Sequence, residues 1–272
     1  MSSIRDSLSP ELENIKKKIE EGNESTNEVK IIVKEIRDKI DKPKRIQMPH
    51  RFKEPGYDVY YTYELIKMGR HPLEIEYEIE NITRETMADI NDVEDDWLGN
   101  PQQWADVQKA HPKTTRILVC DNKIVGYFFY LFLKAEVIEK IKNGSHSDAE
   151  HNLENIVYAD FPGDYPLYFD DIAVLQECRP RGSILLMDDF VNQLIEYAKV
   201  GIFITELCSV AFTEQGEQAC KHFEMQITGK SNIGGGKFKD VYSLTLLPFP
   251  KDGYVAKRYP KLKKLYDKKF NA

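Results

Sequence analysis

The sequence predicts an α/β (α+β) fold, in which a mixed, mostly antiparallel central sheet is flanked by helices and follows an N-terminal helical hairpin. Three stretches predict it: residues 115–133 have the pattern of a β-hairpin, residues 167–201 that of a strand, a basic turn and a helix, and residues 1–45 that of two amphipathic helices. With 272 residues and 41% hydrophobic content, the chain can form one principal core with an appended segment.

Residues 1–45 predict a helical hairpin or a coiled-coil arm. Ser9 and Pro10 suit a helix start, Gly22 separates two runs of apolar residues at helical spacing, and Pro43 ends the second run. Because each apolar face is narrow, we expect the arm to dock on the main domain or to form a homodimer. Residues 46–71 are a tyrosine-bearing connector for which the pattern predicts no element.

The first elements of the main domain are expected from residue 72 onward. Residues 73–79 alternate apolar side chains with glutamates, which is typical of a half-buried strand. Two helices are then expected, from Thr83 to about Trp97 and from Pro101 to about Lys109.

A β-hairpin is expected between residues 115 and 133. Both flanks of the Asp121-Asn122 pair are apolar, and this pair suits a type I′ turn. Residues 126–130 would then form the middle strand of the sheet.

The stretch from Leu167 to Gly201 predicts an anion site. Leu167 to Val174 has the pattern of a buried strand, residues 178–183 are rich in Arg, Pro and Gly and must turn, and a helical apolar face begins at Ile184. A basic turn before a helix N-terminus binds anions, because free N–H groups and the positive end of the helix dipole point the same way.

This turn resembles the phosphate-binding signature of the GCN5-related N-acetyltransferase (GNAT) superfamily. That signature has arginine or glutamine, two residues, glycine, one residue, and then glycine or alanine. Its counterpart here is Arg179-Pro180-Arg181-Gly182-Ser183-Ile184, in which Ile184 replaces the last small residue. The resemblance extends over roughly residues 72–248, with an insertion at about 134–156, and it identifies the chain as a divergent member followed by a basic C-terminal tail, 249–272.

The resemblance implies acetyl-CoA, or another acyl-CoA, as co-substrate and no metal. Residues 179–184 would hold the pyrophosphate, and the backbone of Ile172, Ala173 and Val174 would pair with pantetheine. In the family, the strand and helix that follow, here residues 202–211 and 214–225, splay away and leave a V-shaped gap. A backbone N–H, at Val174 or a neighbour, would stabilise the oxyanion.

Candidate catalytic groups lie on three elements. Asp171, Asp170 and Glu206 are candidate bases, since carboxylates beside apolar strand residues have raised pKa values. Because successive strand residues face opposite sides, at most one of the two aspartates is expected to line the site. Water in place of any residue is an alternative base.

For the acid, the resemblance places Cys220 at the position of the family's proton-donating tyrosine and Glu224 at that of a glycine. Cys220 is either that acid or a buried structural thiol, and Tyr242 and Tyr168 are substitutes.

Charge is distributed unevenly along this chain of net charge −7. Residues 71–100 contain ten carboxylates against Arg84 alone, and residues 251–272 contain eight basic residues against two acidic ones. One interpretation is that both segments are solvated faces. The other is that the acidic segment attracts a cationic amine, and that the basic segment contacts RNA, an acidic membrane or the acidic segment itself.

Localisation and partners follow from what the sequence lacks. It has no apolar run of eighteen residues, no apolar leader at its N-terminus and no close pair of cysteines. We therefore expect a cytoplasmic protein, with neither membrane nor nucleic acid as a partner.

The function implied by the resemblance is acyl-CoA-dependent N-acyltransfer. Acetyl would pass from acetyl-CoA to an amine-bearing acceptor, a small molecule or a protein or peptide, by direct attack in a ternary complex. The alternative is a catalytically degenerate GNAT-fold binding or regulatory module, because Pro180, Ile184, Cys220 and Glu224 all depart from the usual pattern.

Overall fold

The computed structural model of the chain describes residues 56–86, 99–234 and 236–270. The helical hairpin expected over residues 1–45 lies outside them, as does the part of the expected 83–97 helix beyond Thr86. The chain divides into two compact units, and the second, Pro49–Ala272, contains every element described below.

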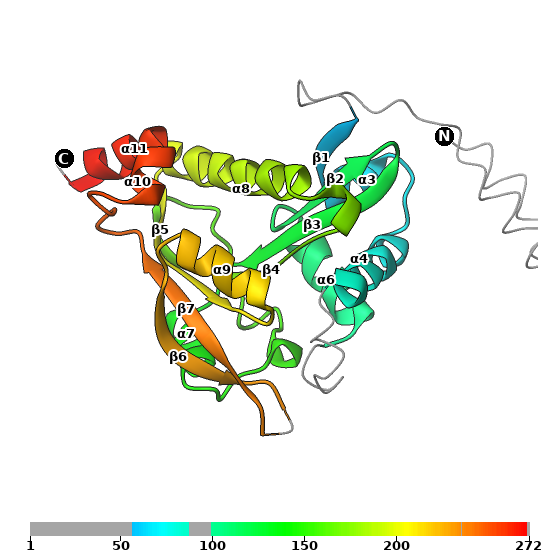
Figure 1. Cartoon of the computed structure of the whole chain (residues 1–272), viewed down its shortest axis with the longest axis horizontal. Coiled ribbons are helices and arrows are strands. Elements are labelled where there is room, and N and C mark those ends of the chain that lie inside the picture. Colours follow the sequence, from blue (N-terminus) through cyan, green and yellow to red (C-terminus); the bar gives the residue numbers. More distant parts are fainter. Residues whose placement is uncertain (1–55, 87–98, 235, 271–272) are drawn as a thin grey trace, which may run out of the picture. The chain divides into compact units, whose positions relative to one another are not determined.

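The described unit is built on a seven-stranded sheet of order β1-β2-β3-β4-β5-β7-β6 (Figure 1). Neighbouring strands are antiparallel except for β4 and β5, which are parallel. The predicted mixed, mostly antiparallel fold is therefore confirmed. The strands are β1 Tyr57–Tyr61, β2 Thr115–Cys120, β3 Lys123–Leu131, β4 Gly163–Val174, β5 Ile202–Val210, β6 Gln226–Asn232 and β7 Phe238–Thr245.

Two features of the sheet relate to the sequence predictions. The β2–β3 hairpin has its turn at Asp121 and Asn122, whose φ values of 47° and 66° confirm the predicted left-handed pair. Strand β1 lies in the segment expected to be a connector, and it pairs along β2 from Tyr57 to Tyr61.

Helices cover both faces of the sheet, as two consecutive residues of β3 show. The Tyr127 hydroxyl meets Thr83 of α4, whereas the Phe128 ring packs on Phe190 of α8. The helices are α3 Thr62–Lys67, α4 Pro72–Thr86, α6 Pro101–Ala110, α7 Ala135–Lys142, α8 Arg181–Lys199, α9 Glu214–His222, α10 Tyr254–Arg258 and α11 Pro260–Phe270, with short 3₁₀ turns at Asp148–Glu150 and Gln176–Cys178.

The strand predicted over residues 73–79 is wrong, because this segment belongs to α4. Ile75, Ile79 and Ile82 are buried, at spacings of four and three that place them on one helical face. Tyr77, which a strand would bury with Ile75, is exposed. The segment looked like a strand because Ile75 and Ile79 are four residues apart, a spacing that both a strand, with a period of two residues, and a helix, with a period of 3.6 residues, place on one face.

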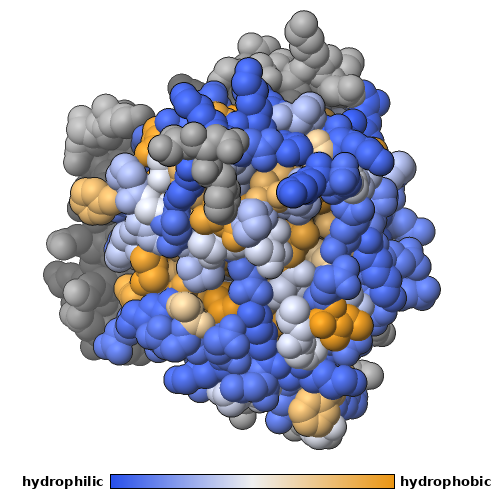
Figure 2. Space-filling model, turned by 90° about the vertical axis from the view of Figure 1, so that its left-hand side faces the viewer, coloured by the Kyte–Doolittle hydropathy of each residue, from blue (hydrophilic) through white to orange (hydrophobic). Residues whose placement is uncertain are grey.

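The basic C-terminal residues fold onto the same unit. Helix α11 packs against α8, and the hydroxyl of its buried Tyr266 accepts a hydrogen bond from the N–H of Ile204 on β5, 2.8 Å away. Lys269 pairs with Asp164, and Arg258 lies 3.3 Å from Asp188. The face at the left of Figure 1, where these helices lie, is mostly hydrophilic with small hydrophobic patches (Figure 2).

Among the helices that the structure describes, none combines the length and the apolar character needed to cross a bilayer.

Candidate active site

Strands β4 and β5 separate along their length, which opens the sheet. Their parallel pairing begins at Gly163–Ile202 and ends at Tyr168–Cys208, after which β4 pairs only with β3 and β5 only with β7. The V-shaped gap implied by the resemblance is therefore present between residues 169–174 of β4 and the end of β5.

The free edge of β4 directs backbone groups into this gap. The Leu175 N–H donates to the carbonyl of Val125, near the start of β3. Because alternate residues of a strand direct their N–H groups to opposite edges, the N–H groups of Ile172 and Val174 point toward β5.

A cavity of about 500 Å³ occupies the gap and reaches both faces of the sheet. On the α8 face it is lined by Arg179, Ser183 and Met187, and on the α4 face by Thr83 and Trp104. Of the residues predicted to bind the cofactor, Ile172, Val174, Arg179 and Ser183 line it, whereas Ala173, Pro180, Arg181, Gly182 and Ile184 do not.

Asp170 and Asp171 both line the cavity, so the expectation that at most one would do so is wrong. The pairing of β3 with β4 skips a residue: Phe129 pairs with Asp171 and Tyr130 with Phe169, which leaves Asp170 as the extra residue of a β-bulge. The bulge breaks the strict alternation of side chains and brings both carboxylates to the α4 side.

Asp171 belongs to a hydrogen-bonded group on the α4 side of the sheet, which we call the inner end of the cavity. The Tyr127 hydroxyl donates to its carboxylate and also meets the hydroxyl of Thr83. Burial raises the pKa of Asp171, while the hydrogen bonds from Tyr127 and from the N–H of Ile172 lower it, and the result is a pKa of about 6.

Glu76 is a second carboxylate at this end of the cavity, and sequence reasoning missed it as a site residue. Only the helical reading of α4 places Glu76 beside the buried Ile75 and Ile79. Its side chain is buried, and burial raises its pKa from 4.5 to about 8.

The basic turn occupies the other end of the cavity, at the N-terminus of α8. This helix begins at Arg181, three residues before the predicted start, and its first backbone hydrogen bond runs from the Ile184 N–H to the Pro180 carbonyl. The three N–H groups before Ile184 precede that first helical bond, as an anion site requires. Ile184 itself is 52% exposed and does not fill the turn.

Gly182 is required by close packing of the turn on the sheet. A Cβ at this position would lie 2.8 Å from Leu118 and 2.9 Å from Val174, closer than side-chain atoms approach. The glycine thus lets the N-terminus of α8 approach the strands.

The two residues that the resemblance singles out at this end of the fold are Cys220, within α9 (Glu214–His222), and Glu224, just after it. Cys220 lines the cavity from α9, and burial raises the pKa of its thiol to about 11. Glu224 takes the left-handed conformation (φ 61°) that suits the family's glycine, and its carboxylate accepts a hydrogen bond from the Tyr254 N–H at 2.8 Å.

Glu206 is not brought to the site. Its carboxylate forms an ion pair with Lys142 of α7 at 2.8 Å, and Glu206 does not line the cavity, whereas the next residue, Leu207, does. The alternation of strand side chains therefore turns Glu206 away from the gap.

At the level of sequence, neither a family model nor a curated protein matches the chain. Solved structures are similar in fold. A GNAT-family acetyltransferase from Streptococcus agalactiae is 19% identical, with a TM-score of 0.40 over 70% of this chain and 96% of its own. Ard1 from Thermoplasma volcanium is 12% identical, with a TM-score of 0.43 over 71% and 99%. GphF, a GNAT-like decarboxylase in complex with isobutyryl-CoA, is 12% identical, with a TM-score of 0.44 over 70% and 99%.

The strand order, the gap between two parallel strands and the helix that begins at the basic turn together form a mixed α/β fold of the kind that the resemblance to the GNAT superfamily implies.

Proposed function

We propose that this chain is an acyl-CoA-dependent N-acyltransferase, which transfers acetyl from acetyl-CoA to an amine by direct attack in a ternary complex. The continuous cavity supports this most strongly. It runs from Arg179 and Ser183, at the anion-binding end, through the gap in the sheet to Glu76 and Asp171 at the acidic end. A thioester and an amine entering from opposite faces would meet at the free edge of β4.

On the α8 side, the pyrophosphate of CoA would bind at the N–H groups of residues 181–183 and at Arg179. The Arg179 side chain already folds back over the strand end, because its Nε donates to the Val174 carbonyl at 2.6 Å. The backbone groups of Ile172 and Val174 that point into the gap would pair with pantetheine as an added strand would. The Val174 N–H would polarise the thioester carbonyl.

On the acidic side, an amine must lose a proton to become a nucleophile. Its nitrogen would attack the carbonyl carbon, the tetrahedral oxyanion would collapse, and the C–S bond would break to release the CoA thiolate. We propose Asp171 as the group that accepts the amine proton, since its carboxylate lines this end and a pKa of about 6 leaves it ionised at neutral pH. Glu76, whose pKa is about 8, takes this role only at higher pH, where it too is ionised. The negative charge of Asp171 also favours a cationic amine over an anionic acceptor.

The role of proton donor suits Cys220 poorly. A thiol whose pKa is about 11 is a weaker acid than an ordinary thiol with a pKa of about 8.5, so it would not readily protonate the departing CoA thiolate. We propose that Cys220 fills space beside the cavity and that the proton reaches sulfur from the carboxylate that took it from the amine, or from water.

Calorimetric titration with acetyl-CoA tests the proposal. Wild-type protein should bind in the micromolar range, and Arg179→Glu/Arg181→Glu should weaken binding by at least a hundredfold. Lys109→Glu/Lys268→Glu is the matched control: it makes the same change in net charge at two exposed lysines outside the cavity, and it should bind as the wild type does.

Turnover distinguishes the enzyme from the degenerate module. Release of free CoA thiol on incubation with acetyl-CoA and a panel of primary amines supports the enzyme. Binding of acetyl-CoA without turnover of any amine would favour the regulatory module. A folded protein that binds no acyl-CoA would refute the enzyme and leave a binding module with another partner.

A further inference from the structure

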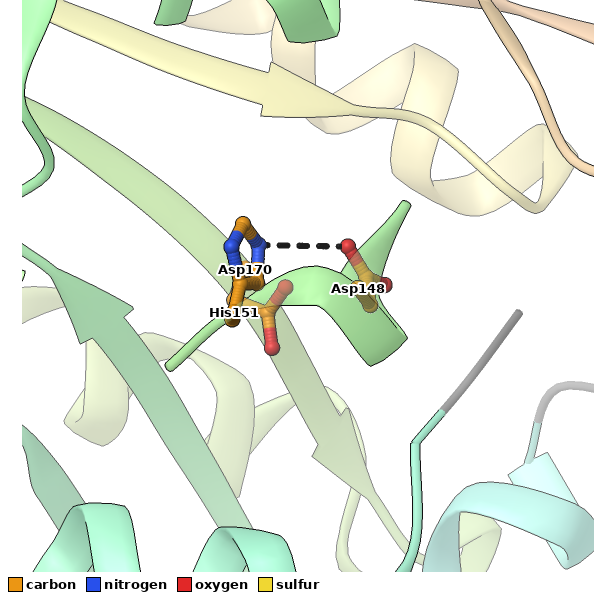
Figure 3. Close-up of side chains that lie close together, drawn as sticks. All are labelled: Asp148, His151 and Asp170. Carbon is orange, nitrogen blue, oxygen red and sulfur yellow. Dashed lines mark ion pairs between the residues drawn. The ribbon is translucent and has the colours of Figure 1, made fainter. Parts of the chain in front are cut away.

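Three side chains that the proposed reaction does not use meet beside the inner end of the cavity. Asp148 and His151 come from the short 3₁₀ turn in the insertion after α7 and its following residue, and Asp170 is the bulged residue of β4 (Figure 3). One potential ligand atom from each lies within 4.8 Å of the others, and His151 Nε2 is 3.4 Å from a carboxylate oxygen of Asp148.

Two polar atoms of this cluster are buried without a hydrogen bond. Within the described part of the chain, neither Nε2 of His151 nor one carboxylate oxygen of Asp170 has such a partner, and the His151 side chain is fully buried. Buried polar atoms in native proteins nearly always have a hydrogen-bond partner or bind an ion. This nitrogen and this oxygen are therefore suited to coordinate a cation together.

The surroundings hold His151 and Asp148 in place. Nε2 of His146 lies 3.1 Å from Nδ1 of His151, and a hydrogen bond there leaves the other ring nitrogen aimed at the cluster. Gln103 of α6 donates to the backbone carbonyls of Asp148, Ala149 and His151 at 3.3, 3.2 and 2.8 Å. These contacts fix the turn in the manner of the outer shell of a metal centre.

The charge of the cluster also calls for a cation. Asp148 and Asp170 are two carboxylates whose oxygens lie within 4.8 Å of each other. A divalent ion would neutralise the pair.

We propose that Asp148, His151 and Asp170 bind a divalent transition-metal ion, with zinc as the best-fitting probe. Two carboxylates and one imidazole are donors that Zn²⁺ and Mn²⁺ accept, whereas Mg²⁺ and Ca²⁺ prefer oxygen alone. Zinc ligands lie about 2.0–2.2 Å from the ion, so side-chain shifts of a few tenths of an ångström would bring all three atoms into range.

Such an ion would tie the insertion to β4 and would stand at the cavity. Asp148 and Asp170 both line the cavity, so an open coordination position would face it. This proposal replaces the expectation from the sequence that the chain has no metal site, and it holds whether or not the chain transfers acyl groups.

The test uses full-length protein stripped with a chelator and titrated with Zn²⁺, Mn²⁺ and Mg²⁺ by calorimetry. We expect one Zn²⁺ per chain with micromolar or tighter affinity, weaker Mn²⁺ and no Mg²⁺ binding. At a hundredfold excess over the dissociation constant, Zn²⁺ should raise the melting temperature by about 5–10 °C.

Variants locate the site. Asp170→Asn, which keeps the side-chain volume, and His151→Gln should each weaken Zn²⁺ binding by at least a hundredfold. Asp240→Asn and His222→Gln alter an aspartate and a histidine outside the cluster and should bind as the wild type does.

A variant-free readout covers the case in which either substitution prevents folding. X-ray absorption of the wild-type zinc complex should show nitrogen and oxygen ligands without sulfur. No binding by folded protein at millimolar Zn²⁺, binding that Asp170→Asn leaves unchanged, or a sulfur ligand would each overturn the proposal.

Discussion

Replacing Glu76 with glutamine should stabilise the protein, by an amount that grows with pH. Burial raises the pKa of this carboxyl from 4.5 to about 8, so ionising it costs more in the folded protein than in the unfolded chain. A tenfold change in an acid constant corresponds to about 1.4 kcal/mol, which gives an upper limit of about 5 kcal/mol. Because Glu76 borders a cavity that admits water, we expect about 2 kcal/mol.

The sign follows from the direction of the pKa change. Below about pH 4.5, Glu76 is protonated in both states and the variant gains nothing. Between pH 4.5 and 8 the unfolded chain ionises while the folded protein keeps the proton, so wild type loses stability relative to the variant. Above about pH 8 the difference is constant. Asp148, Asp170 and Asp171 share this end of the cavity and are present in both proteins, so their own pH dependence largely cancels in the difference between wild type and variant.

Urea unfolding at pH 5, 6.5 and 8 measures this difference. Glu74→Gln is the matched control, because Glu74 lies two residues earlier on the same helix with a side chain that is 55% exposed. Its effect should vary by less than about 0.5 kcal/mol over this range. If the effect of Glu76→Gln is equally flat, Glu76 is not buried as a neutral carboxyl and the reasoning fails.

Three further substitutions test the proposed site. Asp171→Asn should lower kcat about 10²–10³-fold with little change in acetyl-CoA affinity if this carboxylate accepts the amine proton, and an unchanged kcat would leave the role to Glu76 or water. Gly182→Ala should cost about 1–3 kcal/mol in unfolding free energy and weaken acetyl-CoA binding, since its Cβ would press on Leu118 and Val174; calorimetry that finds normal affinity would contradict the placement of the phosphate turn. Cys220→Ala should change kcat by less than tenfold, and a loss of more than a hundredfold would restore the thiol as the proton donor.

The local elements were predictable because short stretches of sequence encode them. The type I′ turn needs only two adjacent residues that tolerate positive φ, and Asp121-Asn122 has this property. The strand, turn and helix around Gly182 follow from composition and apolar spacing, and the resemblance to the GNAT signature depends on those same residues. The helix α4 was not predicted, since the alternation in 73–79 satisfied a strand as well, and the burial of Ile82 and the exposure of Tyr77 separate the two interpretations.

The candidate site could be predicted only where it lies on one element. The cavity-lining residues Ile172, Val174, Arg179 and Ser183 belong to a single strand–turn–helix unit, and the sequence places them correctly along it. Glu206 could not be assigned in this way, because the face on which a strand residue lies depends on the register of its neighbours.

By itself, the sequence determined the β2–β3 hairpin, the strand, basic turn and helix around Gly182, and the mixed sheet, since turn propensity and apolar periodicity act over a few residues. Only the tertiary structure decided which side chains meet. The bulge at Asp170 exists because β3 and β4 pair out of step by one residue, and this turned two adjacent carboxylates to the same side. His151 reaches Asp170 only because the insertion folds back across the sheet, a contact between positions nineteen residues apart that no local pattern encodes.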